Sequence, residues 1–174
     1  MMDNIKGGFS MKKLLILFLT LSMCFSAAQA TVLVSNPWID ATPDDFLQLV
    51  GVRFGLPEDA QDVSYRLLID ESLCEMHFTW QDIAFTARLR PVMDWEDISG
   101  MYYTFTQTPV QVNRCEGNLL RAQDGENDVL LCLWYDLAPG LMYSLSAVAP
   151  ALSDDMLLEA ANAVFIMHQH ETDE

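Results

Sequence analysis

One histidine and three arginines are the residues best placed for chemistry in this chain. In segments that alternate between apolar and polar residues, Arg66, His77, Arg88 and Arg90 all fall on the polar side. Neighbouring strands would bring these four side chains together. The spacing therefore predicts a basic cluster that binds an anionic group or a partner protein. The alternative is that each arginine pairs with a surface carboxylate and contributes little by itself.

Nucleophilic catalysis requires a nucleophile, a base and a group that orients the base. His77 is the only histidine within the alternating segments, and the sequence contains no nucleophile elbow, P-loop or Rossmann glycine pattern. We therefore expect a protein that is not an enzyme, with no catalytic residues and no cofactor. A hydrolase that uses His77 is the alternative.

Two further motifs resemble metal sites. His168-Gln169-His170-Glu171 offers two imidazoles and a carboxylate, but residues at i and i+2 of a helix point apart, and neither HExxH nor paired-cysteine spacing is present. The acidic segment 124–128 lacks the ligand layout of an EF-hand, and its turn residues are typical of a hairpin. We expect no metal site.

The cysteines Cys74, Cys115 and Cys132 are an odd number, which would allow one disulfide and one free thiol. The expected strand register places Leu119 opposite Cys132 across a hairpin, and opposite Cys115 across a turn at residues 116–118. These two cysteines would then flank a middle strand, roughly 9–10 Å apart. Because that distance is too long for a disulfide, buried free thiols are expected.

The region from Val63 to Ser146 carries the period-2 pattern of half-buried strands. Its short connections, including the hairpin signal Asp124-Gly125-Glu126-Asn127, imply antiparallel neighbours. The expected strands are residues 63–70, 75–80, 83–90, 101–105, 110–112, 119–123, 129–135 and 141–145.

Two helices flank these strands. Thr42 and Pro43 are typical of a helix start, and Gly51 of its end, while Ser153 begins an amphipathic helix that is expected to reach about Met167. The sequence predicts an α+β fold: an antiparallel β-meander of about seven or eight strands, with one face covered by the C-terminal helix and a short N-terminal helix.

The N-terminus predicts export. Residues 11–30 have the basic start, apolar core and small residues of a signal peptide, with cleavage after Ala30. A lipoprotein attached through Cys24 is the alternative. Residues 1–10 are interpreted as an untranslated leader that was included in the protein sequence by a mistaken choice of start codon. This interpretation implies a bacterial gene. Residues 31–174 would form a single globular domain that ends in a frayed tail, 168–174.

The chain is strongly acidic, with 25 aspartates and glutamates against 9 lysines and arginines and a formal net charge of −16. Such a charge argues against nucleic acid and anionic membranes as partners. No segment after the signal peptide is expected to span a membrane.

Four motifs resemble a known family: Ala84–Arg88, Trp95–Tyr103, Tyr143–Ser146, and a helix opened by Ser153 with the pattern Leu-Leu-x-x-Ala-Asn. They are similar to small exported proteins of gut Firmicutes that carry the domain of unknown function four-three-six-seven. This domain also occurs in the outer part of anti-sigma-factor-like proteins. The resemblance covers roughly residues 36–167 and implies a β-meander with a C-terminal helix. It implies no catalytic residues.

These observations predict a secreted or envelope-associated, non-enzymatic binding or sensory module for a protein partner or a small extracellular ligand. The alternative is a carrier of an apolar ligand between sheet and helix. A carrier needs a cavity of several hundred cubic ångströms. It would be lined by methionine and aromatic side chains, which are otherwise expected in the core: Met76, Trp80, Trp95, Met101, Trp134 and Met142.

Overall fold

The structure is a computed structural model that describes residues 36–165. Several sequence predictions lie outside these residues: the leader at 1–10, the signal peptide at 11–30 with Cys24 and the cleavage after Ala30, and the tail with its histidine motif.

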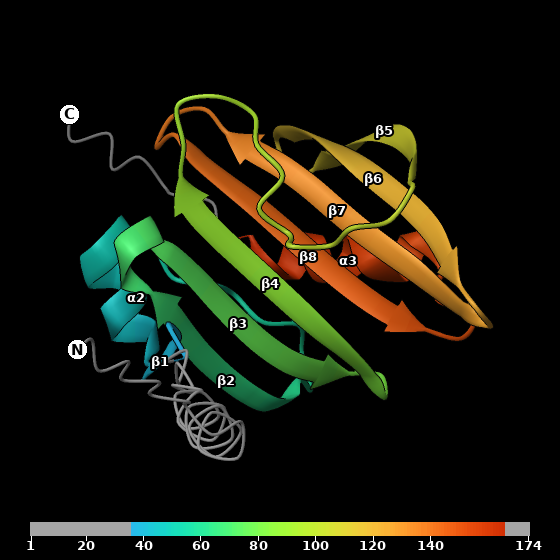
Figure 1. The fold of residues 1–174 in the computed structure, drawn as a ribbon, viewed down its shortest axis with the longest axis horizontal. Coiled ribbons are helices and arrows are strands. Elements are labelled where there is room, and N and C mark those ends of the chain that lie inside the picture. The colour runs from blue at the N-terminus through green and yellow to red at the C-terminus, as the bar shows by residue number, and fades with distance from the viewer. Residues whose placement is uncertain (1–35, 166–174) are drawn as a thin grey trace, which may run out of the picture. The chain divides into compact units, whose positions relative to one another are not determined.

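The described residues form an eight-stranded sheet in which every neighbouring pair is antiparallel (Figure 1). The strand order is β1-β2-β3-β4-β8-β7-β6-β5, so two four-stranded meanders are joined by the pairing of β4 with β8. This confirms the predicted fold class. The strands are β1 Ile39–Ala41, β2 Gln61–Leu68, β3 Leu73–Trp80, β4 Ile83–Pro91, β5 Thr106–Val112, β6 Cys115–Asp124, β7 Asn127–Asp136 and β8 Leu141–Ala149.

One predicted strand is wrong. Residues 101–105 belong to the connection between β4 and β5, and the strand begins only at Thr106. The alternation of Met101 and Phe105 with polar residues has a different cause, because these two side chains pack onto a face of the sheet together with Ile98. The strand expected at residues 63–70 is β2, which begins and ends two residues earlier, since the one-turn 3₁₀ helix η1, Ile69–Glu71, follows Leu68 directly.

Both helices begin where their capping residues predicted. The Thr42 hydroxyl accepts a hydrogen bond from the Asp45 amide, and the Asp45 carboxylate accepts one from the Thr42 amide at 2.8 Å. Helix α2, Pro43–Val50, then ends at Gly51, whose φ of 79° suits a glycine. Ser153 caps α3, Asp154–Val164. The expected end of α3 near Met167 lies outside the described residues.

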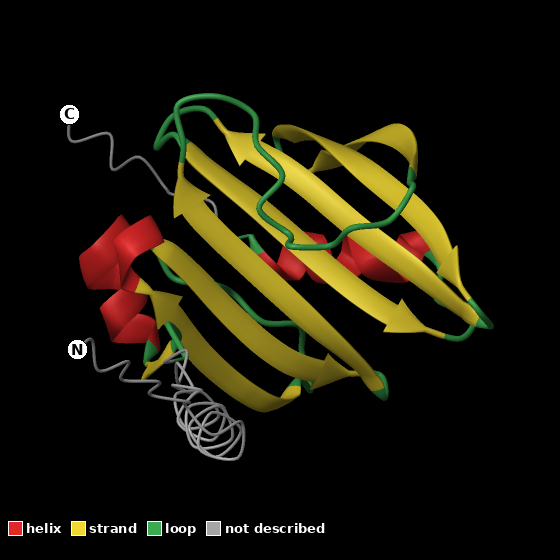
Figure 2. Ribbon diagram, viewed as in Figure 1, coloured by secondary structure: helices red, strands yellow, loops and turns green. Residues whose placement is uncertain are grey.

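The helices cover one face of the sheet. Helix α3 packs on β5, β7 and β8, and lies behind β7 and β8 in Figure 2. Phe46 of α2 packs edge-to-face against Phe54 and Tyr65. Between α3 and the sheet, the rings of Trp134 and Tyr143 are stacked and fully buried. The predicted apolar face is therefore a packed core.

The opposite face is also partly covered, which the sequence did not predict. The connection from β4 to β5, residues 92–105, crosses in front of β7 and β8 in Figure 2. Ile98 packs there in a second hydrophobic cluster, with the buried residues Leu73, Leu131, Leu133 and Met142. Strands β7 and β8 are thus buried on both sides, whereas β2, β3 and β4 carry charged residues on this face.

The three described cysteines are buried free thiols, as predicted. Burial raises the pKa of Cys74 and of Cys132 to about 12, which keeps these thiols protonated and unreactive. Leu119 lies opposite Cys132, as expected, but the register of Cys115 is wrong. Cys115 is the first residue of β6 and pairs with Val112, because the chain turns at Asn113 and Arg114.

Candidate functional site

Three of the four residues predicted to form a basic cluster do come together. Arg66, Glu75 and Arg88 lie directly opposite one another on β2, β3 and β4, and His77 follows two residues after Glu75 on β3. Arg90 lies apart from them and forms long ion pairs with Glu71 at 3.6 Å and Glu96 at 3.8 Å.

The centre of the cluster is the Glu75 carboxylate, which is completely buried. Arg66 donates from Nε at 3.0 Å and also from Nη2 to Glu75 Oε1, while Arg88 Nε donates to Oε2 at 2.6 Å. Burial alone would raise the pKa of the Glu75 carboxyl. The hydrogen bonds and charge of the two arginines, and a hydrogen bond with His77, outweigh burial and hold this pKa below its usual value of 4.5.

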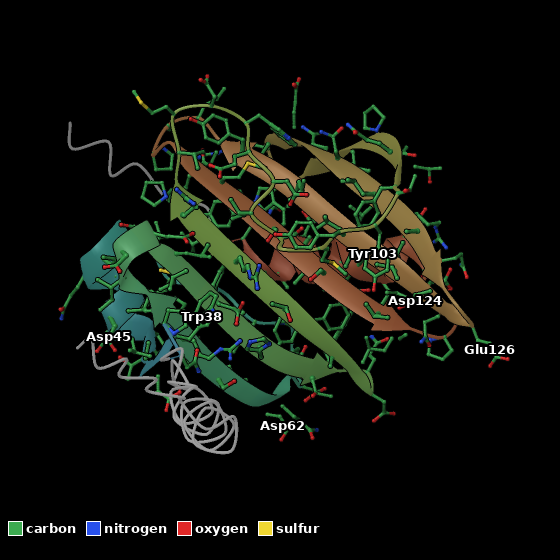
Figure 3. All side chains as sticks on the ribbon, viewed as in Figure 1. Trp38, Asp45, Asp62, Tyr103, Asp124 and Glu126 are labelled. Atoms are coloured by element: carbon green, nitrogen blue, oxygen red, sulfur yellow. The ribbon has the colours of Figure 1, made fainter. Side chains whose placement is uncertain are left out.

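Neighbouring elements hold the two arginines in place. Arg88 Nη1 donates to the carbonyl oxygens of Ile98 at 3.3 Å and Ser99 at 2.5 Å, which attaches the 92–105 connection to the cluster. The ring of Trp38, labelled in Figure 3, lies within 5.1 Å of the Arg66 guanidinium and 5.7 Å of that of Arg88. The positive charges thus already have an internal counter-ion, and the predicted binding of an external anion or partner here stays a prediction.

His77 is part of a hydrogen-bonded chain. Its Nε2 lies 2.6 Å from Glu75 Oε1, and its Nδ1 lies 3.1 Å from Thr86 Oγ1. If Nε2 carries a proton, it donates to Glu75, and the Thr86 hydroxyl can donate to Nδ1. The resulting order of carboxylate, imidazole and hydroxyl is the one that nucleophilic catalysis uses. Arg66 Nη2 lies 2.8 Å from the same Nε2 and competes for Glu75.

The lowered pKa of Glu75 predicts an acid sensitivity. The folded protein binds a proton at Glu75 less tightly than the unfolded chain does, so this group stabilises the fold above about pH 4.5 and loses its contribution as the pH falls through the lower, folded-state pKa. We expect the difference in free energy of unfolding between the wild type and Glu75→Gln to be constant near neutral pH and to shrink in acid. Urea unfolding at a series of pH values measures it. A difference that stays unchanged in acid would contradict the assignment.

A second site lies at the end of the sheet around Trp95, and the sequence did not predict it. A hollow of about 550 Å³ is lined by Trp95 of the 92–105 connection, the first residues of β6, the last residues of β7 and the turn after β7. A second hollow of about 750 Å³ lies against β5 and β6 and shares Trp95 and Glu116 with the first. Volumes of this size are typical of small-molecule sites.

The polar residues of the first hollow are Arg114, Glu116, Tyr135 and Asp136. Asp136 is only 3 % exposed, and among the described residues its Oδ2 has no hydrogen-bond partner. Its nearest cation is Arg114, whose Nη2 is 3.8 Å from Oδ2. Burial and the charge of Asp136 both raise the pKa of the neighbouring Cys115 thiol, even though Arg114 opposes them. Cys115 is therefore not an activated nucleophile.

One signal in the sequence could have identified Asp136. It ends the apolar run from Val129 to Tyr135, and it shares the helix-facing side of β7 with Cys132 and Trp134. A carboxylate at such a position is either paired or functional. Two apolar side chains that line the hollow are exposed to solvent, Leu137 to 81 % and Trp95 to 45 %.

Comparison of the chain with protein-family models, with curated proteins and with solved structures finds no match. The family resemblance therefore stays a prediction. Within residues 36–165, no helix has the length and apolar character needed to cross a lipid bilayer. The same residues contain no group of three or more His, Cys, Asp and Glu side chains arranged to hold a metal ion.

Proposed function

We propose that this protein is an exported, non-enzymatic binding module that recognises a small ligand, or a side chain of a partner, in the hollow beside Trp95. The main observation that supports this proposal is that two hollows share Trp95 and Glu116 in their lining. Exposed apolar side chains border them, and such side chains are concentrated at binding surfaces. Export rests on the signal peptide predicted at residues 11–30.

The packing between sheet and helix supports a module of this kind over a carrier. Met76 and Trp134, two of the residues expected to line a carrier cavity, have no exposed surface. The Phe165 ring packs edge-to-face on both Trp134 and Tyr143, and fills the space beside α3. An apolar cargo in this layer would have to displace these rings.

A hydrolase that uses His77 is the second candidate. The series of hydrogen bonds from Glu75 through His77 to Thr86 favours it. Thr86 is in the interior of β4, in the row of residues that continues to Ser146 on β8. The hollows at Trp95 are lined by other residues, so these three side chains line neither of them. Neither hollow would therefore place a substrate against Thr86, which weakens this candidate.

Fragment screening by NMR tests the proposed site. Each of the four tryptophans carries one indole N–H group, and a Trp95→Phe variant assigns the signal from Trp95. We expect that some members of a mixed set of cationic, neutral and anionic fragments shift the Trp95 signal and leave the buried Trp134 signal in place.

Two outcomes would contradict the proposal. Shifts confined to Trp134 would indicate that ligands enter the core, which is the carrier alternative. The absence of any fragment that moves Trp95 would indicate that the hollows bind nothing. Tyr102→Ala is the matched control, because Tyr102 is an aromatic residue of the same connection, is 95 % exposed and does not line either hollow.

A further inference from the structure

The Asp136 carboxylate indicates which ligand charge the Trp95 hollow would accept. A carboxylate oxygen that is buried without a hydrogen bond is costly, and proteins keep such a group where a partner completes it. Asp136 lines the hollow, and its Oδ2 has no hydrogen-bond partner among residues 36–165. Asp136 Oδ2 can therefore accept a hydrogen bond from a ligand, and a cationic donor would form the strongest bond.

Arg114 satisfies this need only partly. Its Nη2 is 3.8 Å from Asp136 Oδ2, which is beyond hydrogen-bond distance, and 45 % of its side chain is exposed. Arg114, at the edge of the hollow, thus compensates the charge of Asp136 without a hydrogen bond to it. A ligand ammonium group that reaches Oδ2 would replace a long ion pair with a charge-assisted hydrogen bond.

The other walls of the hollow also suit a cation with an apolar body. Glu116 adds a second carboxylate, and Trp95 offers an aromatic ring to which an ammonium group is attracted. The neighbours of Trp95 in the chain are Asp94 and Glu96, and the whole chain carries a net charge of −16, which raises the local concentration of cations. Leu137 and Ala138 add apolar surface to the lining of the hollow.

We propose that the Trp95 hollow binds a small organic amine, with its ammonium group on Asp136 and its apolar body against Trp95 and Leu137. This assignment rests on the proposed function and adds the charge of the ligand to it. It also assigns Arg114 the role of a competing cation, which the ligand displaces.

Three probes of similar size and different charge test the assignment: phenethylamine, 2-phenylethanol and 3-phenylpropionate. Titrations of the full chain, followed at the Trp95 indole signal, should show that phenethylamine binds most tightly. Asp136→Asn should weaken amine binding by about tenfold or more, because the ionised acceptor is lost. Arg114→Gln should strengthen it several-fold, because the competing cation is removed. Glu126→Gln, which removes a carboxylate at the distant hairpin tip, should change it little.

The Arg114→Gln result provides a second test if Asp136→Asn fails to fold, because 45 % of the Arg114 side chain is exposed and its loss breaks no direct hydrogen bond to Asp136. Tighter binding of 3-phenylpropionate, together with its loss in Arg114→Gln, would overturn the amine assignment and leave the binding site itself intact. Equal binding of all three probes would overturn it in the same way. If none of them moves Trp95 while other fragments do, the amine assignment fails alone. If no fragment does, the proposed function fails as well.

Discussion

Replacement of Glu75 by glutamine should lower the free energy of unfolding by about 3 kcal/mol at neutral pH, because it removes one partner of a buried ion cluster and leaves the others uncompensated. Glu75 has no exposed surface, and it accepts hydrogen bonds from both Arg66 and Arg88. The estimate lies at the lower end of the usual range, since the side chains of Arg66 and Arg88 are 36 % and 21 % exposed and regain some hydration.

Glu96→Gln is the matched control for this substitution. Among residues 36–165, Glu96 makes only a long ion pair with Arg90 at 3.8 Å, and its side chain is 51 % exposed, so its loss should cost less than about 0.5 kcal/mol. Equilibrium unfolding in urea, followed by tryptophan fluorescence, compares the two variants. If Glu75→Gln costs no more than Glu96→Gln, the cluster does not stabilise the fold.

The effect should also extend beyond β2, β3 and β4. Arg88 joins the cluster to the carbonyl oxygens of Ile98 and Ser99, so the loss of Glu75 frees the guanidinium that holds the 92–105 connection. In Glu75→Gln we therefore expect faster amide hydrogen exchange in this connection as well as a lower global stability. The Trp95 site is built on the same connection.

Local patterns in the sequence predicted most of the fold, because each element carries its own signal. Thr42 and Ser153 cap their helices through contacts within three residues, and the hairpin at Asp124–Asn127 depends on two central residues. Period-2 alternation identified both faces of β4. The same alternation failed at residues 101–105, because a connection that crosses a sheet can also pack apolar side chains onto it: Met101 and Phe105 are partly buried, whereas Tyr103 between them is exposed.

The candidate site required information that no local pattern contains. Polar alternation placed Arg66, His77 and Arg88 on one face, but whether their charges are free depends on Glu75, which becomes fully buried only when three strands pair. The position of Cys115 depended on a turn that lies at residues 113–114 and not at 116–118 as expected. The Trp95 hollow depends on the path of a 14-residue connection, 92–105, and on where β6 begins relative to the end of β7.

Replacement of Trp134 by alanine should lower the free energy of unfolding by about 3–5 kcal/mol, because it opens a large cavity in the layer between α3 and the sheet. Trp134 has no exposed surface, and its ring stacks on Tyr143 at a centroid distance of 5.2 Å with 8° between the planes. Phe165 packs against the edges of both rings. The neighbouring rings can collapse into the cavity only in part, since each of them is already held by the others.

Trp134→Phe separates packing from hydrogen bonding at this position. The Trp134 Nε1 group is buried without a hydrogen-bond partner among the described residues, so phenylalanine loses volume and no hydrogen bond. We expect this variant to cost only about 1–2 kcal/mol. Added indole should stabilise Trp134→Ala, because an apolar cavity of matching shape binds small aromatic molecules.

The size of the Trp134→Ala effect also decides between two functions. In a binding module with a packed core, the removed ring has close neighbours on all sides and its loss is costly. In a carrier, the space between sheet and helix is hollow before the substitution, so removal of one ring from its wall would cost less than about 1.5 kcal/mol and would change the capacity for apolar ligands. Urea unfolding of the two variants, with and without indole, therefore tests the packed core on which the assignment of binding to the Trp95 hollow depends.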